Sequence, residues 1–276
     1  MSHYYCMKGG VAQRYKPLKA NGEEYIRIPA GMAAKAGAVL GVTDLQRVIG
    51  NTAGLNIYYM NNGIQAGLEI GNALPHYSIA ELLQDAKERA KELTEQAANE
   101  GTAIHDAIQT WLEGGPLSDN PVHAAAQVGA GRWLSSKDIP QPYACEHNAC
   151  ERALLYRGEI DGQKVGYGGT TDFIAPSLIA DWKTVRDSDW GRGRKPKWSE
   201  AAQLAAYRIA GHDMGLCKED SDCFNLYFGR ESGELLHVQH WTKRELEHGL
   251  WLFVEAVRVG HRIELMDACI GRGMGK

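Results

Sequence analysis

Two aspartates and a lysine in neighbouring apolar segments have the types and spacing that hydrolytic chemistry requires. Asp172 lies in the segment 168–174, and Asp181 and Lys183 lie two residues apart in the segment 178–184. We predict that both segments are strands joined by a short turn. Because residues i and i+2 of a strand point to the same face, Asp181 and Lys183 share a face, and the hairpin can bring Asp172 beside them.

These three side chains suit metal-assisted hydrolysis at the rim of a sheet. The apolar start of the second strand predicts a buried position, where charges are costly unless they are paired or bound to a metal. Carboxylates are ligands for Mg²⁺ or Mn²⁺, which lower the pKa of a bound water and stabilise charge on a phosphate. Lys183 can orient that water or balance the developing charge. The residues alone leave open a second interpretation, a buried ion pair between Asp181 and Lys183 without chemistry.

Length and composition favour one large domain, or one domain with a helical extension. The chain has 276 residues, 44% of them hydrophobic, and a net charge of −4. This charge argues against a protein held on nucleic acid by its overall charge, but it allows a local basic groove. No apolar run is long enough to span a membrane, and the N-terminus lacks the apolar core of a signal peptide. We therefore expect a cytoplasmic protein without a membrane partner.

The six cysteines include no C-x-x-C pair. A chain of this length needs no disulfide for stability, so free thiols are the simplest expectation. An iron–sulfur cluster built from Cys6, Cys217, Cys223 and Cys269 is an alternative, although the spacing of these residues is unlike that of known clusters.

The strongest predicted helix begins at a capping box, Ser78–Glu81, and its apolar stripe continues at helical spacing to Trp111. Gly101 lies on this stripe, where a helix would prefer alanine, so it indicates a close backbone approach or a kink. His105 follows one turn later, at the edge of the apolar face. Gly114 and Gly115 end the helix.

The remaining pattern predicts further helices and strands around the hairpin. Gln203 and Tyr207 are four residues apart in one predicted helix and therefore share a face. Glu146 and Glu151 lie in an extended segment before the hairpin. The predicted elements are a hairpin or loop within 1–41, around 25–28, helices at about 42–50, 55–63 and 122–135, an extended segment at 143–156, a helix at 199–212, a hairpin at 224–228 and 235–241, and a final helix at 242–266.

A polar loop at 184–198 holds five basic residues, two acidic residues and two tryptophans. Such a charged run is typical of a solvated loop. Basic residues that alternate with aromatic ones are also typical of a groove for single-stranded nucleic acid, with cations on phosphates and rings under bases. The candidate DNA-binding residues are Arg186, Trp190, Arg192, Arg194, Lys195, Lys197 and Trp198.

Taken together, four blocks resemble the RecB-like branch of the PD-(D/E)XK nuclease superfamily, which includes phage-type exonucleases. The mitochondrial genome maintenance exonuclease has a similar arrangement. The resemblance covers about residues 42–260 and depends on the order of the blocks as much as on each block. The blocks are Gly101–His105 (Gly-x-x-x-His), Gly169–Asp172 (Gly-x-x-Asp), Asp181–Thr184 (Asp-x-Lys-Thr) and Gln203–Tyr207 (Gln-x-x-x-Tyr).

The resemblance implies an α/β fold with a restriction-endonuclease-like core. We expect a mixed central β-sheet flanked by helices, with an N-terminal helical extension. The implied division is an extension at 1–77 packed on the core, a nuclease core at 78–266, and a mobile tail at 267–276. The proline of the family name is replaced by Thr171, as is common in the branch. Residues 157–166 look like an inserted turn.

The resemblance also implies a role for each site residue. Lys183 would position the attacking water, and Gln203 and Tyr207 would contact DNA or orient Lys183. The family often has a further glutamate on the preceding strand, for which we prefer Glu146 over Glu151. The implied metal ligands, for Mg²⁺ or Mn²⁺, are Asp172, Asp181, the main-chain oxygen of Trp182, and His105.

The implied activity is that of a divalent-metal-dependent deoxyribonuclease. An exonuclease acting on DNA ends or single strands, in phage recombination or DNA degradation, is the preferred form, with a single-strand annealing protein as a conceivable partner. Two alternatives stay open. One is a structure-specific or complex-associated endonuclease on the same core, and the other is a catalytically silent nucleic-acid-binding subunit.

Overall fold

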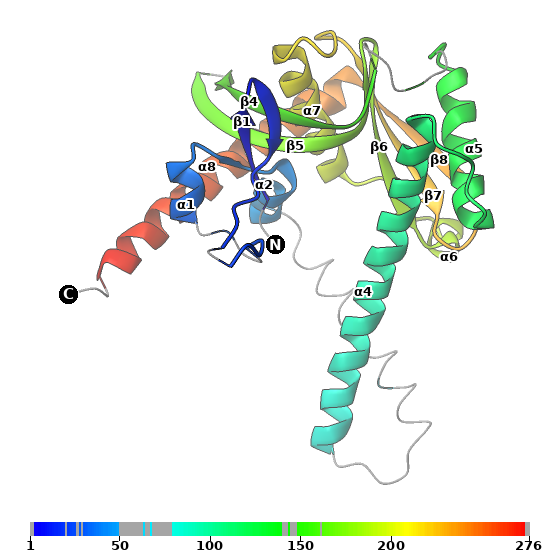
Figure 1. The fold of residues 1–276 in the computed structure, drawn as a ribbon, viewed down its shortest axis with the longest axis horizontal. Coiled ribbons are helices and arrows are strands. Elements are labelled where there is room, and N and C mark those ends of the chain that lie inside the picture. The colour runs from blue at the N-terminus through cyan, green and yellow to red at the C-terminus, as the bar shows by residue number, and fades with distance from the viewer. Residues whose placement is uncertain are drawn as a thin grey trace.

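The described part of the chain folds around two sheets (Figure 1). The structure is a computed structural model, and it describes residues 3–19, 21–25, 28, 30–49, 63, 67, 79–139, 143, 148–160 and 162–273. The larger sheet has five strands in the order β4-β5-β6-β7-β8. Its strands are β4 (Ala149–Ile160), β5 (Gln163–Ala175), β6 (Leu178–Val185), β7 (Asp222–Gly229) and β8 (Leu235–Trp241).

The five-stranded sheet is mixed. Strands β4, β5 and β6 pair antiparallel, β6 and β7 pair parallel, and β7 and β8 pair antiparallel. The parallel pair needs a crossover connection, which helix α7 (Trp198–Asp213) supplies. The short helix α6 (Asp187–Gly191) precedes α7. This arrangement confirms the predicted α/β class with a mixed central sheet flanked by helices, and it is consistent with the expected restriction-endonuclease-like core.

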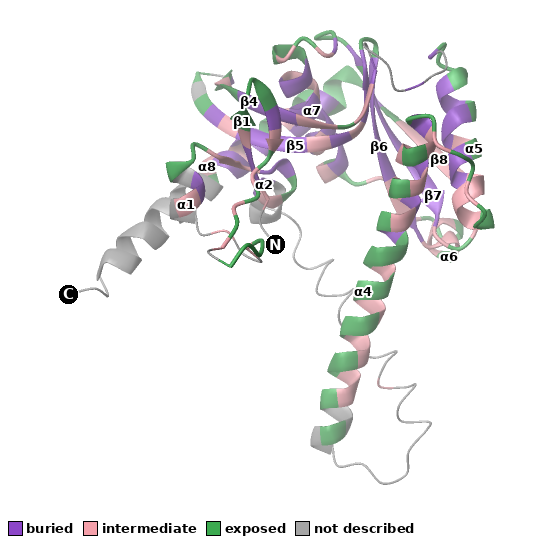
Figure 2. Ribbon diagram, viewed as in Figure 1, coloured by how far each residue is buried: buried purple, intermediate pink, exposed green. Residues whose placement is uncertain are grey.

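Helices cover both faces of the sheet, and each face has its own apolar core (Figure 2). Phe173 and Trp182 face helices α4 (Ile79–Leu112) and α5 (Pro121–Ser135). The alternate residues Ile174 and Ile179 face α7, α8 (Lys243–Gly273) and α2 (Val42–Ile49). Because side chains alternate across a strand, this double burial explains why β6 is apolar on both faces.

The N-terminal part contains a three-stranded sheet in the order β2-β1-β3, besides helices. Its strands are β1 (Tyr4–Lys8), β2 (Val11–Arg14) and β3 (Val39–Leu40), and helix α1 spans Ala30–Lys35. Strands β1 and β2 form a hairpin before the segment 25–28, where we expected one and of which residues 26 and 27 lie outside the described residues. Gly9 and Gly10 form its turn with φ of 59° and 79°, a left-handed conformation that glycine adopts without strain. The predicted extension is thus partly β-structure.

Several other expectations concern the ends of elements. The segment 157–166 is not a separate inserted turn, because β4 and β5 stay paired from Ala149↔Ile174 to Ile160↔Gln163. Helix α8 continues to Gly273, beyond the end predicted at about 266, and Thr242 forms its capping box with Glu245. The helix predicted at 55–63 lies outside the described residues, apart from residue 63. The division into extension, core and tail stays a prediction.

Two further observations concern the described residues. No described helix combines the length and the apolar character that a membrane span requires. Cys6, Cys150, Cys217 and Cys223 are free thiols, as expected.

Candidate active site

The two aspartates and the lysine converge where β5 and β6 separate. The strands pair from Ala175↔Leu178 to Phe173↔Ala180, and the next position of this register places Asp172 opposite Asp181. The main-chain N–H of Trp182 donates to Asp172 Oδ2 at 2.6 Å instead of continuing the ladder. The predicted hairpin and the shared face of Asp181 and Lys183 are therefore present in the structure.

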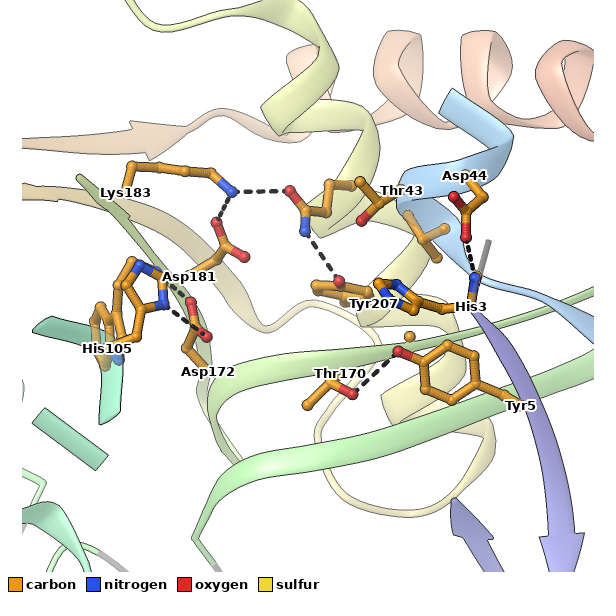
Figure 3. A pocket seen from close by; sticks show the side chains of 15 residues that line it. His3, Tyr5, Thr43, Asp44, His105, Thr170, Asp172, Asp181, Lys183 and Tyr207 are labelled. Carbon is orange, nitrogen blue, oxygen red and sulfur yellow. Dashed lines mark hydrogen bonds and ion pairs between the residues drawn. The ribbon is translucent and has the colours of Figure 1, made fainter. Parts of the chain in front are cut away.

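A chain of polar contacts runs from Asp181 into helix α7 (Figure 3). Lys183 forms an ion pair with Asp181 Oδ2, and its Nζ donates to Gln203 Oε1 at 3.0 Å. Gln203 Nε2 donates in turn to the Tyr207 hydroxyl at 2.9 Å. Gln203 and Tyr207, which the sequence placed on one helical face, thus fix the position of the Lys183 ammonium.

His105 approaches from helix α4, on the other side of Asp172. Its Nδ1 lies 3.4 Å from Asp172 Oδ1, and the two side chains are 28% and 18% exposed. Burial opposes a charged imidazole, but the charge of Asp172 outweighs it and raises the pKa of His105. The predicted neighbourhood of His105 and Asp172 is therefore present, although the histidine contacts the carboxylate directly.

The two aspartates differ in their ionisation. Burial raises the pKa of Asp181 to about 6, although the adjacent Lys183 opposes this shift. Burial also acts on Asp172, but His105, Lys183 and the Trp182 N–H outweigh it and hold its pKa below the usual value. Burial would lower the pKa of Lys183, yet Asp181 and Asp172 reverse the shift and raise it. Lys183 is therefore a cation at neutral pH.

Glycines in the recognised blocks allow the site elements to approach one another. A Cβ at Gly101 would lie 2.6 Å from Thr184 Oγ1, which confirms the close backbone approach that we predicted there. A Cβ at Gly169 would lie 2.4 Å from a ring carbon of Tyr207. Both distances are shorter than packing tolerates, so a larger residue would require the Thr184 side chain or the buried Tyr207 ring to move.

The candidate site residues Asp172, Asp181 and Lys183 line a pocket of about 240 Å³. Its far wall comes from the N-terminal part, where His3 and Asp44 lie beside Tyr5, and the Tyr5 hydroxyl is 3.2 Å from Thr170 Oγ1. Sequence reasoning missed these residues, because about 165 positions separate Tyr5 from Thr170. One signal was available: Gly168, next to Gly169, makes room for the Tyr5 ring.

Of the two candidates for the supporting glutamate, Glu146 and Glu151, the structure describes only Glu151. Glu146 lies outside the described residues, so its role stays a prediction. Glu151 lies where the pairing of β4 and β5 is interrupted, between Cys150↔Phe173 and Arg152↔Thr171, and its φ of 44° is unusual for a residue other than glycine. Burial, followed by the charge of Asp172, raises the pKa of Glu151. Glu151 is exposed and is not among the residues that line the pocket, so the choice between the two glutamates stays a prediction.

The donors that face the pocket are of the kind that hard divalent cations accept. The pocket is lined by Asp172, Asp181, Trp182 and His105, which offer carboxylate oxygens, a main-chain oxygen and an imidazole. In the described ranges, however, no group of three or more His, Cys, Asp or Glu side chains is already arranged to hold a metal ion. Binding would require these side chains to exchange some of their present contacts for the ion.

Comparison with known proteins gives no family assignment. No protein-family model and no curated protein matches the chain. The crystal structure of a candidate exonuclease from Eubacterium rectale is similar, with 12% identity over 85% of this chain and 87% of that chain and a TM-score of 0.40. The crystal structure of SSO0001 is similar over 75% of this chain and 86% of that chain, with 11% identity and a TM-score of 0.33. These values are too low to decide a function.

The candidate DNA-binding residues differ in their exposure and in the contacts that they make within the protein. Trp190 packs its ring against Tyr227 and His237, with centroids 4.8 and 5.0 Å apart, and so anchors α6 to the sheet. Trp198 is 43% exposed at the start of α7. Arg192 forms an exposed ion pair with Asp189 at 2.5 Å. Arg194 is half-buried. Contact of Arg186, Trp190, Arg192, Arg194, Lys195, Lys197 and Trp198 with DNA stays a prediction.

Proposed function

We propose that this protein is a divalent-metal-dependent deoxyribonuclease of the RecB-like PD-(D/E)XK type, and that it acts as an exonuclease on DNA ends or single strands. The observation that carries the proposal is the convergence of Asp172, Asp181 and Lys183 on one pocket at the fork of two strands. Two carboxylates and a lysine in this arrangement match the requirements of metal-assisted phosphodiester hydrolysis.

Asp172, Asp181, the main-chain oxygen of Trp182 and His105 would hold Mg²⁺ or Mn²⁺. Such an ion lowers the pKa of a bound water and neutralises charge on the phosphate. Asp172 is suited to this role because its pKa lies below the usual value, so it is charged at every physiological pH. Asp181 is charged mainly above pH 6.

Lys183 supplies the second element of the chemistry. Its ammonium is held between Asp181 and Gln203, so it stands in a fixed position beside the carboxylates. From there it can orient the attacking water and balance the negative charge that grows on the phosphate during an in-line displacement. Tyr207 supports this position indirectly, by accepting a hydrogen bond from Gln203.

The shape of the site favours strand ends or single strands as substrate. His3, Tyr5 and Asp44 close one side of the pocket, so a continuous duplex would have to approach the carboxylates past this wall. A single strand needs less room. The exposed ring of Trp198 offers a surface on which a base can stack.

The proposal is tested with linear DNA labelled at one end beside a covalently closed circle, each with Mn²⁺, with Mg²⁺ and with chelator. We expect metal-dependent degradation of the linear DNA alone, and the labelled end then gives the polarity. Nicking of the circle would show that the protein is an endonuclease on the same core, not an exonuclease. Equal binding of DNA with and without metal, without cleavage of either substrate, would indicate a binding subunit and contradict the proposal.

A further inference from the structure

Asn225 is a fully buried polar residue in the middle of β7, next to the site. It is the partner of Asp181 in the parallel register of β6 and β7. Its Nδ2 donates to Asp181 Oδ2 at 2.8 Å, and its Oδ1 accepts a hydrogen bond from Trp241 Nε1 at 2.7 Å. A buried amide is tolerated only when its hydrogen bonds are made, and here donor and acceptor are both used.

Trp241 decides which way the amide of Asn225 points. The oxygen and nitrogen of an amide have nearly the same shape, so packing alone does not orient it. An indole N–H can only donate a hydrogen bond, and it must therefore face the amide oxygen. The NH₂ group of Asn225 is consequently directed at Asp181, to which it can only donate.

This contact also orients the carboxylate of Asp181. Asn225 and Lys183 both bind the same oxygen, Oδ2. Within the described residues, Oδ1 receives no hydrogen bond, and Asp181 lines the pocket beside Asp172. With Oδ2 held from two sides, the carboxylate has little freedom to rotate.

We propose that Asn225 is a positioning residue, oriented by Trp241, which holds Asp181 Oδ2 so that Oδ1 would be presented to a divalent cation bound in the pocket. This inference rests on the proposed nuclease function. It adds a residue outside the four recognised blocks, on strand β7, which contributes no residue to the pocket lining and acts only through Asp181.

The variant Trp241→Phe tests the inference because it removes the indole N–H while keeping an aromatic ring. We expect kcat to fall by about 10- to 100-fold, the range for partners that orient metal ligands, with KM for DNA unchanged. Raising the Mn²⁺ concentration should restore part of the activity. The matched control is Trp133→Phe, since Trp133 and Trp241 are each 7% exposed and Trp133 lies in the core on the opposite face. Its kcat should stay within about twofold of the wild-type value, because phenylalanine keeps an aromatic ring against Trp182 and, among the described residues, Trp133 donates no hydrogen bond to a proposed metal ligand.

A second readout does not depend on activity. In the metal-free protein, the side-chain amide protons of Asn225 should exchange slowly with water, as observed by ¹⁵N NMR. Their exchange should accelerate in Trp241→Phe and stay unchanged in Trp133→Phe. Unchanged amide signals in Trp241→Phe, or equal kcat in the two variants, would overturn the inference. If the wild type cleaves no DNA, the proposed function fails, while the amide exchange still decides whether Trp241 orients Asn225.

Discussion

The main-chain N–H of Trp182 donates to the side chain of Asp172 at 2.6 Å, across the point where β5 and β6 separate. In a continuous ladder this N–H would bond to a main-chain oxygen of β5, but pairing of the two strands ends at Phe173↔Ala180. The carboxylate of Asp172 takes the place of that acceptor. One side chain therefore satisfies the backbone at the fork and presents a charge to the pocket that the fork opens.

The variant Asp172→Asn separates these two roles. The amide oxygen can still accept the Trp182 N–H, so Tm should change by only a few degrees. The negative charge is lost, so Mn²⁺ affinity, measured by calorimetry, should fall together with cleavage. Asp220→Asn, at an exposed position, is the control and should change neither. Wild-type cleavage by Asp172→Asn would exclude this carboxylate from the chemistry.

The variant Gly169→Ala tests the packing that brings Tyr207 to the site. The new Cβ would lie 2.4 Å from the Tyr207 ring, so the buried ring must move. We expect a loss of about 1–3 kcal/mol of unfolding free energy, as for other overpacked positions, together with reduced cleavage. Denaturant unfolding gives the first value and the DNA assay the second. Gly191→Ala, where a Cβ meets nothing within 4 Å, should be nearly neutral. Equal stability of the two variants would contradict the packing argument.

The stability of the metal-free protein should depend on the ionisation of Asp181. Its folded pKa of about 6 exceeds the unfolded value of about 3.9, so between these values the folded state holds a proton that the unfolded state has released. The contribution of Asp181 to the stability of the folded state is therefore fully present below about pH 4, and it is lost as the pH rises through 6. Urea unfolding is measured in the presence of chelator from pH 4 to 7. The free energy of unfolding should fall more steeply with rising pH for the wild type than for Asp181→Asn. Parallel profiles would show that Asp181 has an ordinary pKa.

The basic loop should contribute to DNA binding through charge. Replacing Arg192, Arg194 and Lys195 by glutamine should weaken binding to a single-stranded oligonucleotide. Each lost phosphate contact should reduce the slope of log K against log salt by about 0.7. Fluorescence anisotropy over a series of KCl concentrations measures this slope. Replacing Lys87 and Lys91, which are exposed on α4, serves as the control. An unchanged slope in the loop variant would indicate that this segment is a solvated loop that does not contact DNA.

The sequence predicted the parts of the site that depend on short-range patterns. Period-two alternation placed Asp181 and Lys183 on one face, and their ion pair confirms it. Helical spacing placed Gln203 and Tyr207 together, and the hydrogen bond between them confirms it. The conformational cost of glycine in a helix predicted the close approach at Gly101, although not its partner Thr184.

The remaining parts depend on contacts between distant segments. Tyr5 reaches the pocket through a strand pairing that no local pattern specifies, because the N-terminal sheet packs on β5 at Gly168. Asn225 looked like one polar residue in an apolar strand, and its role follows only from the parallel register with β6. Trp190 resembled an exposed aromatic residue because its partners, Tyr227 and His237, lie on later strands.

The variant Lys183→Ala tests the central claim most directly. Cleavage of labelled linear DNA and binding of the same DNA are measured on one preparation, with Mn²⁺ and with chelator. The account predicts that cleavage falls by about 10²- to 10³-fold, as for the loss of one charge-stabilising donor, while DNA affinity and Tm remain close to the wild-type values. Wild-type cleavage by a folded Lys183→Ala protein would contradict the account, because Lys183 would then be only the partner of a buried ion pair.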